Sequence, residues 1–156
     1  MSDQYRLFDG DPPGRSPKAR NDVRTGDAAE ALVLFKLLHW GWNAHDARRD
    51  LPYDIVVDIG EGRICRVQVK GRSKATRGRW EYRVSRGNWR SATGTYAYTS
   101  VDYDVSAFVA LSLERVIFVP GIHPSFRAST ADFLRPDGEL QSWDRAIKIF
   151  NRKPMH

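Results

Sequence analysis

The chain has 156 residues, a length that suits one compact domain with its own core. Hydrophobic residues make up 41% of it and charged residues 28%, which is typical of a soluble globular protein. The formal net charge of +6 indicates a polyanionic partner, but it does not choose between DNA, RNA and an acidic protein.

Residue counts exclude several other classes. Cys65 is the only cysteine, so an intrachain disulfide and an all-cysteine metal site are ruled out. The four histidines have no paired short spacing, which argues against structural zinc. No apolar run approaches the roughly 18 residues of a membrane-spanning helix, and the first residues lack a secretory signal. We therefore expect a cytoplasmic protein without membrane contact.

The N-terminal part divides at about residue 25. Residues 1–24 are polar and without periodicity, which predicts a flexible arm. Thr25 offers a helix N-cap, the apolar spacing of 26–40 predicts a helix, and Gly41 is a suitable stop. We expect residues 25–156 to form one domain with a C-terminal helical extension.

The arm contains one short motif. Its residues Gln4, Leu7 and Phe8 resemble the Q-x-x-L-F peptide with which bacterial replication and repair proteins bind the sliding clamp. This resemblance implies a clamp contact. The alternative is a chance match in an arm without function.

The middle of the chain is rich in strand patterns and turn signals. A Gly-Glu-Gly turn at 60–62 joins two strands into a hairpin. Two short helices are expected near the C-terminus, and residues 86–100 form an irregular excursion. We expect strands over 42–45, 53–59, 63–70, 79–85, 105–111 and 115–119, and helices over 129–134 and 142–150.

Alternation along the hairpin brings three polar side chains together. Cys65 shares one strand face with two valines and is expected in the core, whereas Gln68 and Lys70 point the other way. Asp54, at the start of the partner strand, lies opposite residues 68–70 when the turn is near residue 61. The hairpin therefore predicts a carboxylate, an amide oxygen and an ammonium in one place.

These groups suit phosphodiester hydrolysis. Asp54, Gln68 and the backbone carbonyl of Val69 are oxygen ligands of the kind that Mg²⁺ prefers, with Mn²⁺ as a substitute. Glu30, from the first helix, could add a ligand through water. A bound cation activates water and neutralises charge on phosphorus, while Lys70 stabilises the developing negative charge.

The same residues resemble a known superfamily. The ordered set of Pro52-Tyr53-Asp54 and Gln68-Val69-Lys70 is similar to PD-(D/E)XK nucleases, and the Q-x-K form resembles a branch of group I intron-encoded homing endonucleases. Gly26 with Glu30, and the Asp104–Phe108 strand, resemble further motifs of that branch. Gln68 stands where most of the superfamily has an acid.

The resemblance covers residues 25–120 and carries expectations about fold, activity and assembly. It implies an α/β protein with a restriction-endonuclease-like core, a mixed and mainly antiparallel β-sheet flanked by helices. It implies a Mg²⁺-dependent endonuclease acting on double-stranded DNA. Because one core holds one active site, cutting both strands calls for a homodimer or homotetramer.

The positive charge is concentrated in one segment. Residues 63–90 hold ten basic residues against one acid, Glu81, with tryptophan and tyrosine between them. Basic side chains bind phosphates, and aromatic side chains stack on nucleobases. This segment therefore predicts a nucleic-acid-binding surface. The expected contacts are Arg66, Arg72, Lys74, Arg77, Arg79, Arg83 and Arg90.

Each functional interpretation has a structural alternative. Asp54 and Lys70 could form an exposed ion pair, Glu30 could face solvent, and the basic segment could be a solvated hairpin whose aromatic residues face the core. For Asp104 we expect a capping or turn role rather than metal binding. At the level of function, the alternative to a nuclease is a catalytically silent nucleic-acid-binding module on the same fold.

Overall fold

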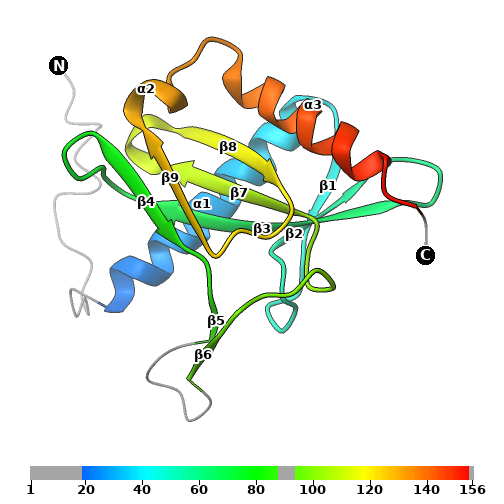
Figure 1. Ribbon diagram of the computed structural model, residues 1–156, viewed down its shortest axis with the longest axis horizontal. Helices are drawn as coiled ribbons and strands as arrows, with labels where there is room; N and C mark the ends of the chain where they lie inside the picture. Colours follow the sequence, from blue (N-terminus) through cyan, green and yellow to red (C-terminus); the bar gives the residue numbers. More distant parts are fainter. Residues whose placement is uncertain (1–18, 88–93, 155–156) are drawn as a thin grey trace, which may run out of the picture.

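The computed structural model describes residues 19–87 and 94–154, and its elements form three layers (Figure 1). A five-stranded sheet lies between a pair of helices and a two-stranded ribbon. The helices are α1 (Ala19–His39), α2 (Thr130–Phe133) and α3 (Gly138–Asn151), with a 3-10 turn η1 (Leu111–Leu113). The strands are β1 (Asn43–Asp46), β2 (Ile55–Asp58), β3 (Ile64–Arg72), β4 (Arg79–Arg83), β5 (Arg86–Gly87), β6 (Thr95–Tyr96), β7 (Val105–Ala110), β8 (Arg115–Pro120) and β9 (Ser125–Ser129).

The central sheet has the order β1-β2-β3-β7-β8. β3 and β7 pair in parallel, whereas the other three neighbouring pairs are antiparallel. The parallel pair is possible because the chain leaves the sheet after β3, forms β4, β5 and β6, and returns. The predicted α/β fold with a mixed, mainly antiparallel sheet flanked by helices is confirmed.

One face of the sheet is covered by α1 and α3. Ala29, Val33 and Leu37 recur every fourth residue on α1, so they share one helix face, and all three are fully buried. They pack with the β3 valines and with Trp143 of α3. Cys65 belongs to this core, as its place on the strand predicted.

The other face is covered by the ribbon of β4 and β9 together with α2. Trp80 and Tyr82 of β4 point inward and are 1% and 3% exposed. Phe126 of β9 stacks on Phe108 of β7, with ring centroids 4.1 Å apart. The hydroxyl of Tyr82 donates to the carbonyl of Val109 at 2.9 Å, so the ribbon is fixed to the sheet by aromatic packing and a buried hydrogen bond.

Two helices begin earlier in the sequence than predicted. α1 begins at Ala19, so residues 19–24 of the predicted arm are its first turns and Thr25 is not its N-cap. Residues 1–18 lie outside the described residues. α3 begins at Gly138, four residues before the predicted start, because buried Glu139 accepts hydrogen bonds from Lys36, Arg115 and the backbone N–H of Val116.

Two strand regions were also predicted incompletely. β9 was not expected, because Phe126 and Ala128 are its only apolar residues; they pack inward while their neighbours face outward. In the excursion at 86–100, β5 and β6 form a short antiparallel pair. Among the described residues, no helix is long and apolar enough to cross a membrane.

Candidate active site

The β2–β3 hairpin places Asp54 and Gln68 opposite each other, as the alternation predicted. Ile55 pairs with Val67 in the register, and the backbone N–H of Asp54 donates to the carbonyl of Val67 at 2.9 Å. Asp54 is therefore the last residue before β2, directly across from Gln68. Gln68 is 6% exposed, so the amide lies inside the protein rather than on its surface.

The Asp54 carboxylate is held through one of its oxygens. Oδ2 accepts the backbone N–H of Val69 and the Nε2 group of Gln68, both at 2.7 Å. Within the described residues, Oδ1 accepts no hydrogen bond. Burial raises the pKa of Asp54, although the hydrogen bond from Val69 and the charge of Lys70 oppose that rise. The carboxylate is thus oriented by the strand, and no cation of residues 19–87 or 94–154 forms an ion pair with it.

Lys70 lies one step further along β3 on the same face. Its Nζ is 5.9 Å from the ring centroid of Tyr98, and no ion pair joins it to an acid among the described residues. Burial lowers the pKa of Lys70, while Asp54 and Glu30 raise it. The alternative of an exposed Asp54–Lys70 ion pair is therefore not what the structure contains.

Glu30 reaches the same pocket from α1. Burial raises its pKa to about 7, and the negative charges of Asp54, Asp27 and Asp46 add to the rise, while Arg49 opposes it. The carboxyl group is half-buried beside other acids, so it is not a solvent-facing helix residue.

Gly71 allows α1 to approach β3 closely enough to place Glu30 there. A Cβ atom on Gly71 would lie 2.6 Å from the Cβ of Ala29 and 3.2 Å from the carbonyl oxygen of Thr25. Gly26, one turn before Glu30 on the same helix face, would meet no atom within 4 Å. The helix therefore contacts the strand at Gly71, whereas at Gly26 it borders the open space of the pocket.

The four predicted site residues line one pocket of about 470 Å³. The pocket also includes Gly26, Val69 and Tyr98. Tyr98 was not predicted, because it lies in the irregular excursion, where alternation gives no orientation. Among the described residues, no three His, Cys, Asp or Glu side chains form a metal cluster, so a cation here would depend on amide and backbone oxygens as well as carboxylates.

Arg66 is engaged within the fold. Its Nε and Nη2 donate to the two carboxylate oxygens of Asp104, each at 3.0 Å. The same carboxylate accepts the backbone N–H of Arg66 at 2.9 Å. The Arg66 guanidinium, predicted to contact nucleic acid, thus binds a buried acid that was expected to have only a turn role.

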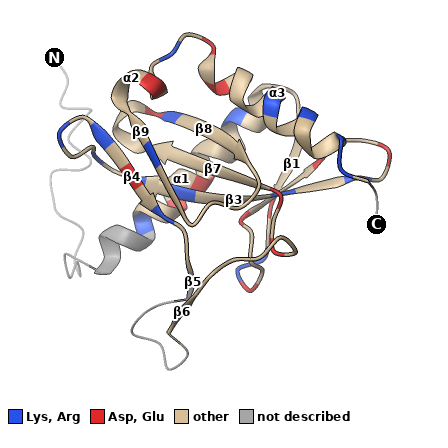
Figure 2. Ribbon diagram, viewed as in Figure 1, with Lys and Arg blue, Asp and Glu red and all other residues tan. Residues whose placement is uncertain are grey.

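The other predicted cations lie at the surface. Arg72, Lys74, Arg77, Arg79 and Arg83 are all exposed, and Arg90 lies outside the described residues. Figure 2 shows basic positions on both strands of the ribbon, with an acidic position on β4 between them. Arg127 on β9 adds a cation that sequence reasoning missed because its strand was missed.

The aromatic residues of the basic segment were partly misassigned. We expected them to stack on nucleobases, but Trp80 and Tyr82 are buried under the ribbon and pack on Phe133 and Phe108. The alternative of aromatic residues facing the core is correct for these two. Tyr96 is 48% exposed. The clamp motif at Gln4, Leu7 and Phe8 lies outside the described residues.

Comparison with known proteins identifies the fold. No family model matches the sequence, and no curated protein matches it. Among solved structures, a bacterial homing endonuclease, I-Ssp6803I, is similar, with a TM-score of 0.61 and 22% sequence identity. The match covers 85% of this chain and 98% of that one. The chain therefore has the α/β fold of that homing endonuclease.

Proposed function

We propose that this protein is a metal-dependent endonuclease of the PD-(D/E)XK superfamily, in its Q-x-K branch, that hydrolyses phosphodiester bonds in double-stranded DNA. The observation that carries the proposal is the convergence of Glu30, Asp54, Gln68 and Lys70 on one pocket. The fold shared with a homing endonuclease supports it, and so does the exposed basic surface beside the pocket.

The pocket residues fit a hard divalent cation, Mg²⁺ or Mn²⁺. Asp54 has a carboxylate oxygen without a hydrogen bond among the described residues, and burial raises the pKa of this carboxyl group, so a bound cation would offset the cost of its buried charge. Asp54, the amide oxygen of Gln68 and the carbonyl of Val69 would hold the ion directly, and Glu30 would hold it through water. When bound, Mg²⁺ would lower the pKa of a coordinated water and neutralise charge on the phosphate.

Lys70 would act on the phosphate itself. Its ammonium lines the pocket, and none of the described acids lies within ion-pair distance of it, so its charge is available to a ligand. A fixed cation at that position stabilises the negative charge that develops on the phosphate oxygens during hydrolysis. Burial in the pocket strengthens this interaction because it reduces screening by water.

The test is the nicking of supercoiled plasmid DNA in Mg²⁺ and in EDTA. The wild-type protein should nick only with Mg²⁺, and Asp54→Ala should lose more than about 90% of the rate, a barrier increase above ~1.4 kcal/mol. Asp58→Ala is the matched control, because Asp58 lies at the far end of β2 from Asp54 and, within the described part of the chain, its carboxylate accepts a hydrogen bond only from the backbone N–H of Gly60. DNA binding without nicking by the wild-type protein would support the silent binding module instead.

Assembly follows from the proposed reaction. The described residues of one chain form one pocket with this set of side chains, so we expect a double-strand break to need a homodimer or homotetramer. This oligomeric state, like the clamp contact of the N-terminal motif, stays a prediction. Sedimentation of the protein with and without a duplex would measure it.

A further inference from the structure

The ribbon of β4 and β9 places apolar side chains on its inward face and polar side chains on its outward face. Along β4, Arg79, Glu81 and Arg83 are exposed while the two residues between them are buried. On β9, Arg127 lies opposite Glu81 and is exposed as well. The outward face is therefore polar and mainly basic.

This outward face has a packed aromatic layer beneath it. Beneath it, the aromatic rings of Tyr82, Phe108 and Phe126 contact one another, with centroid separations between 4.1 and 6.1 Å. The indole N–H of Trp80 donates to the hydroxyl of Thr130 at 3.1 Å. This packing holds the backbone of the ribbon against the sheet, so the outward side chains project from strands of defined register, which favours recognition of a regular ligand.

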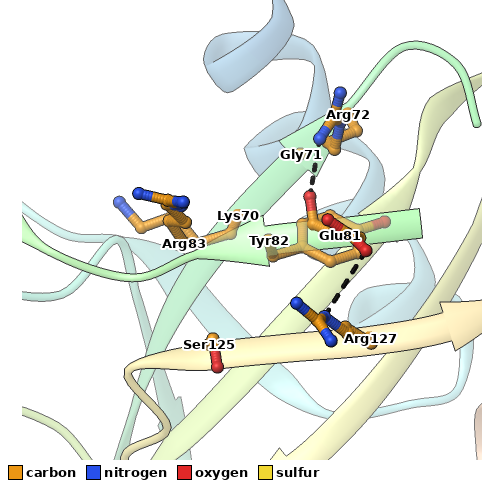
Figure 3. Close-up of a pocket in the computed structure, with 8 residues that line it drawn as sticks. All are labelled: Lys70, Gly71, Arg72, Glu81, Tyr82, Arg83, Ser125 and Arg127. Carbon is orange, nitrogen blue, oxygen red and sulfur yellow. Dashed lines mark hydrogen bonds and ion pairs between the residues drawn. The ribbon is translucent and has the colours of Figure 1, made fainter. Parts of the chain in front are cut away.

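The face is continuous with the proposed active site. Lys70 and Gly71 line both the active-site pocket and a pocket over the ribbon, the second of which is drawn in Figure 3. Beside them, Arg72 donates from Nη1 to the backbone carbonyl of Glu81 at 2.8 Å, which ties the end of β3 to β4. A second pocket over the ribbon shares Arg72 and Glu81 with the first. The charged residues that line the two pockets are six basic residues and one acidic residue, namely Lys70, Arg72, Arg77, Arg79, Arg83, Arg127 and Glu81.

The position of Glu81 indicates that the basic face does more than bind phosphates. Its carboxylate lies 3.4 Å from Nε of Arg127, in the centre of the basic face (Figure 3). A surface that bound only phosphates would be weakened by an acid at its centre. A carboxylate is useful where base edges are read, because it accepts a hydrogen bond from the amino group of cytosine, while arginine binds the O6 and N7 atoms of guanine.

We propose that the outward face of the β4–β9 ribbon enters the major groove of duplex DNA and reads base edges there. Arg83, Arg127 and Glu81 contact the bases, while Arg77 and Arg79 contact phosphates. A two-stranded antiparallel ribbon fits the width of the major groove of B-form DNA. The deep, narrow major groove of an RNA duplex excludes it. The inference rests on the proposed function for its ligand, but it concerns binding and not cleavage.

The first experiment selects duplexes from a randomised DNA pool with the full chain, in Ca²⁺ so that cleavage is suppressed. A consensus sequence should emerge. Methylation of guanine N7, in the major groove, should interfere with binding to the selected duplex, and an RNA duplex of the same sequence should compete poorly. A pool that gives no consensus, interference confined to adenine N3 in the minor groove, or equal competition by RNA would overturn the proposal.

The second experiment assigns the reading to the ribbon. Arg127→Met should lower affinity for the selected duplex about 5- to 150-fold more than for a scrambled duplex, the range of one bidentate arginine–guanine pair. Glu81→Gln should change the preferred base at one position. Lys148→Met is the control, because it removes an exposed charge on α3, on the opposite side of the sheet from the ribbon. It should lower affinity for the two duplexes weakly and equally. Equal losses on both duplexes for Arg127→Met would show that the face binds phosphates only.

The two proposals fail separately. A protein that selects a consensus but never nicks plasmid in Mg²⁺ retains the reading ribbon and is not a nuclease. A protein that nicks but selects no sequence is a nuclease without the reading ribbon.

Discussion

Gly71 on β3 lies against Ala29 on α1 so closely that a methyl group cannot be inserted between them, since the added Cβ would be 2.6 Å from the Cβ of Ala29. This contact sets the distance between the helix that carries Glu30 and the strand that carries Gln68 and Lys70. The acid contributed by α1 is therefore positioned by the smallest residue of β3.

The first prediction follows from that contact. Gly71→Ala should force α1 away from the sheet and lower the free energy of unfolding by about 1–3 kcal/mol, the usual cost of overpacking. Gly26→Ala is the matched control; its Cβ meets no atom within 4 Å, and alanine favours a helix, so stability should be unchanged or higher. Urea unfolding measures the stability of both variants. Equal losses of stability would contradict the close contact between Gly71 and α1.

The second prediction separates catalysis from binding at Lys70. Lys70→Met keeps the apolar stem of the side chain and removes its charge beside the proposed phosphate position. Cleavage in a single turnover should fall by about 10²–10³, whereas affinity for duplex DNA in Ca²⁺ should fall only severalfold. If both fall by the same factor, Lys70 is a binding residue and the binding-module function gains support.

The third prediction concerns pH and Glu30. Its pKa in the folded protein is about 7, above the ordinary value of 4.5, so the folded state binds the extra proton between these values. The metal-free protein should therefore lose stability as pH rises from about 5 to 8, by roughly 1–2 kcal/mol after allowance for the half-exposed carboxyl.

Glu30→Gln should remove most of this pH dependence, while Glu61→Gln, at an exposed position in the β2–β3 turn, should retain it. The measurement is the midpoint of urea unfolding in EDTA across the pH range. An unchanged slope in Glu30→Gln would place the titrating group elsewhere.

The fourth prediction uses the hydrogen bond between Gln68 and Asp54. Gln68→Glu replaces a 2.7 Å donor–acceptor contact with two adjacent carboxylates, so the metal-free protein should lose about 1–2 kcal/mol of stability. The added charge should tighten Mg²⁺ binding, and saturating Mg²⁺ should raise the melting temperature more than in the wild type. An Mg²⁺ response equal to that of the wild type would argue against an ion beside residue 68.

The fifth prediction distinguishes Arg66 from the surface arginines. Arg66→Met leaves the partly buried Asp104 without its cation and should cost about 1–3 kcal/mol of stability, with no change in the salt dependence of DNA binding. Arg79→Met, at an exposed position, should leave stability intact and flatten the slope of log K against log salt by roughly 0.9. The reverse pattern would assign Arg66 to the DNA surface.

The candidate site was largely predictable because it depends on local rules. Asp54, Gln68 and Lys70 belong to one hairpin, and strand alternation together with a short turn fixes their relative positions. Glu30 was placed with them by the resemblance of its motif. The closeness of α1 to β3 could not be predicted, because it depends on the packing of Gly71 against a helix far away in sequence.

The features that were missed depend on non-local contacts. Asp104 meets Arg66 only because β3 and β7 lie side by side in parallel, a pairing that neither strand's own sequence specifies. Glu139 extends α3 because it binds cations from α1 and β8. The sequence did not indicate this extension, because an acidic residue among polar ones does not contribute to an apolar helical pattern. β9 forms because the β4 aromatic residues and β7 provide a surface for it.

The parallel β3–β7 pairing also has a consequence for the order in which the molecule folds. Arg66 and Asp104 are 38 residues apart in the sequence. The chain must therefore close a long loop, at a cost in entropy, before the contacts between β3 and β7 can stabilise it. Such pairings slow folding, and we expect refolding in milliseconds to seconds. The β2–β3 hairpin needs no long loop and can form within about 1–10 μs. The carboxylate and lysine of the proposed site would thus be brought together early in folding, well before the ribbon acquires the sheet on which it packs.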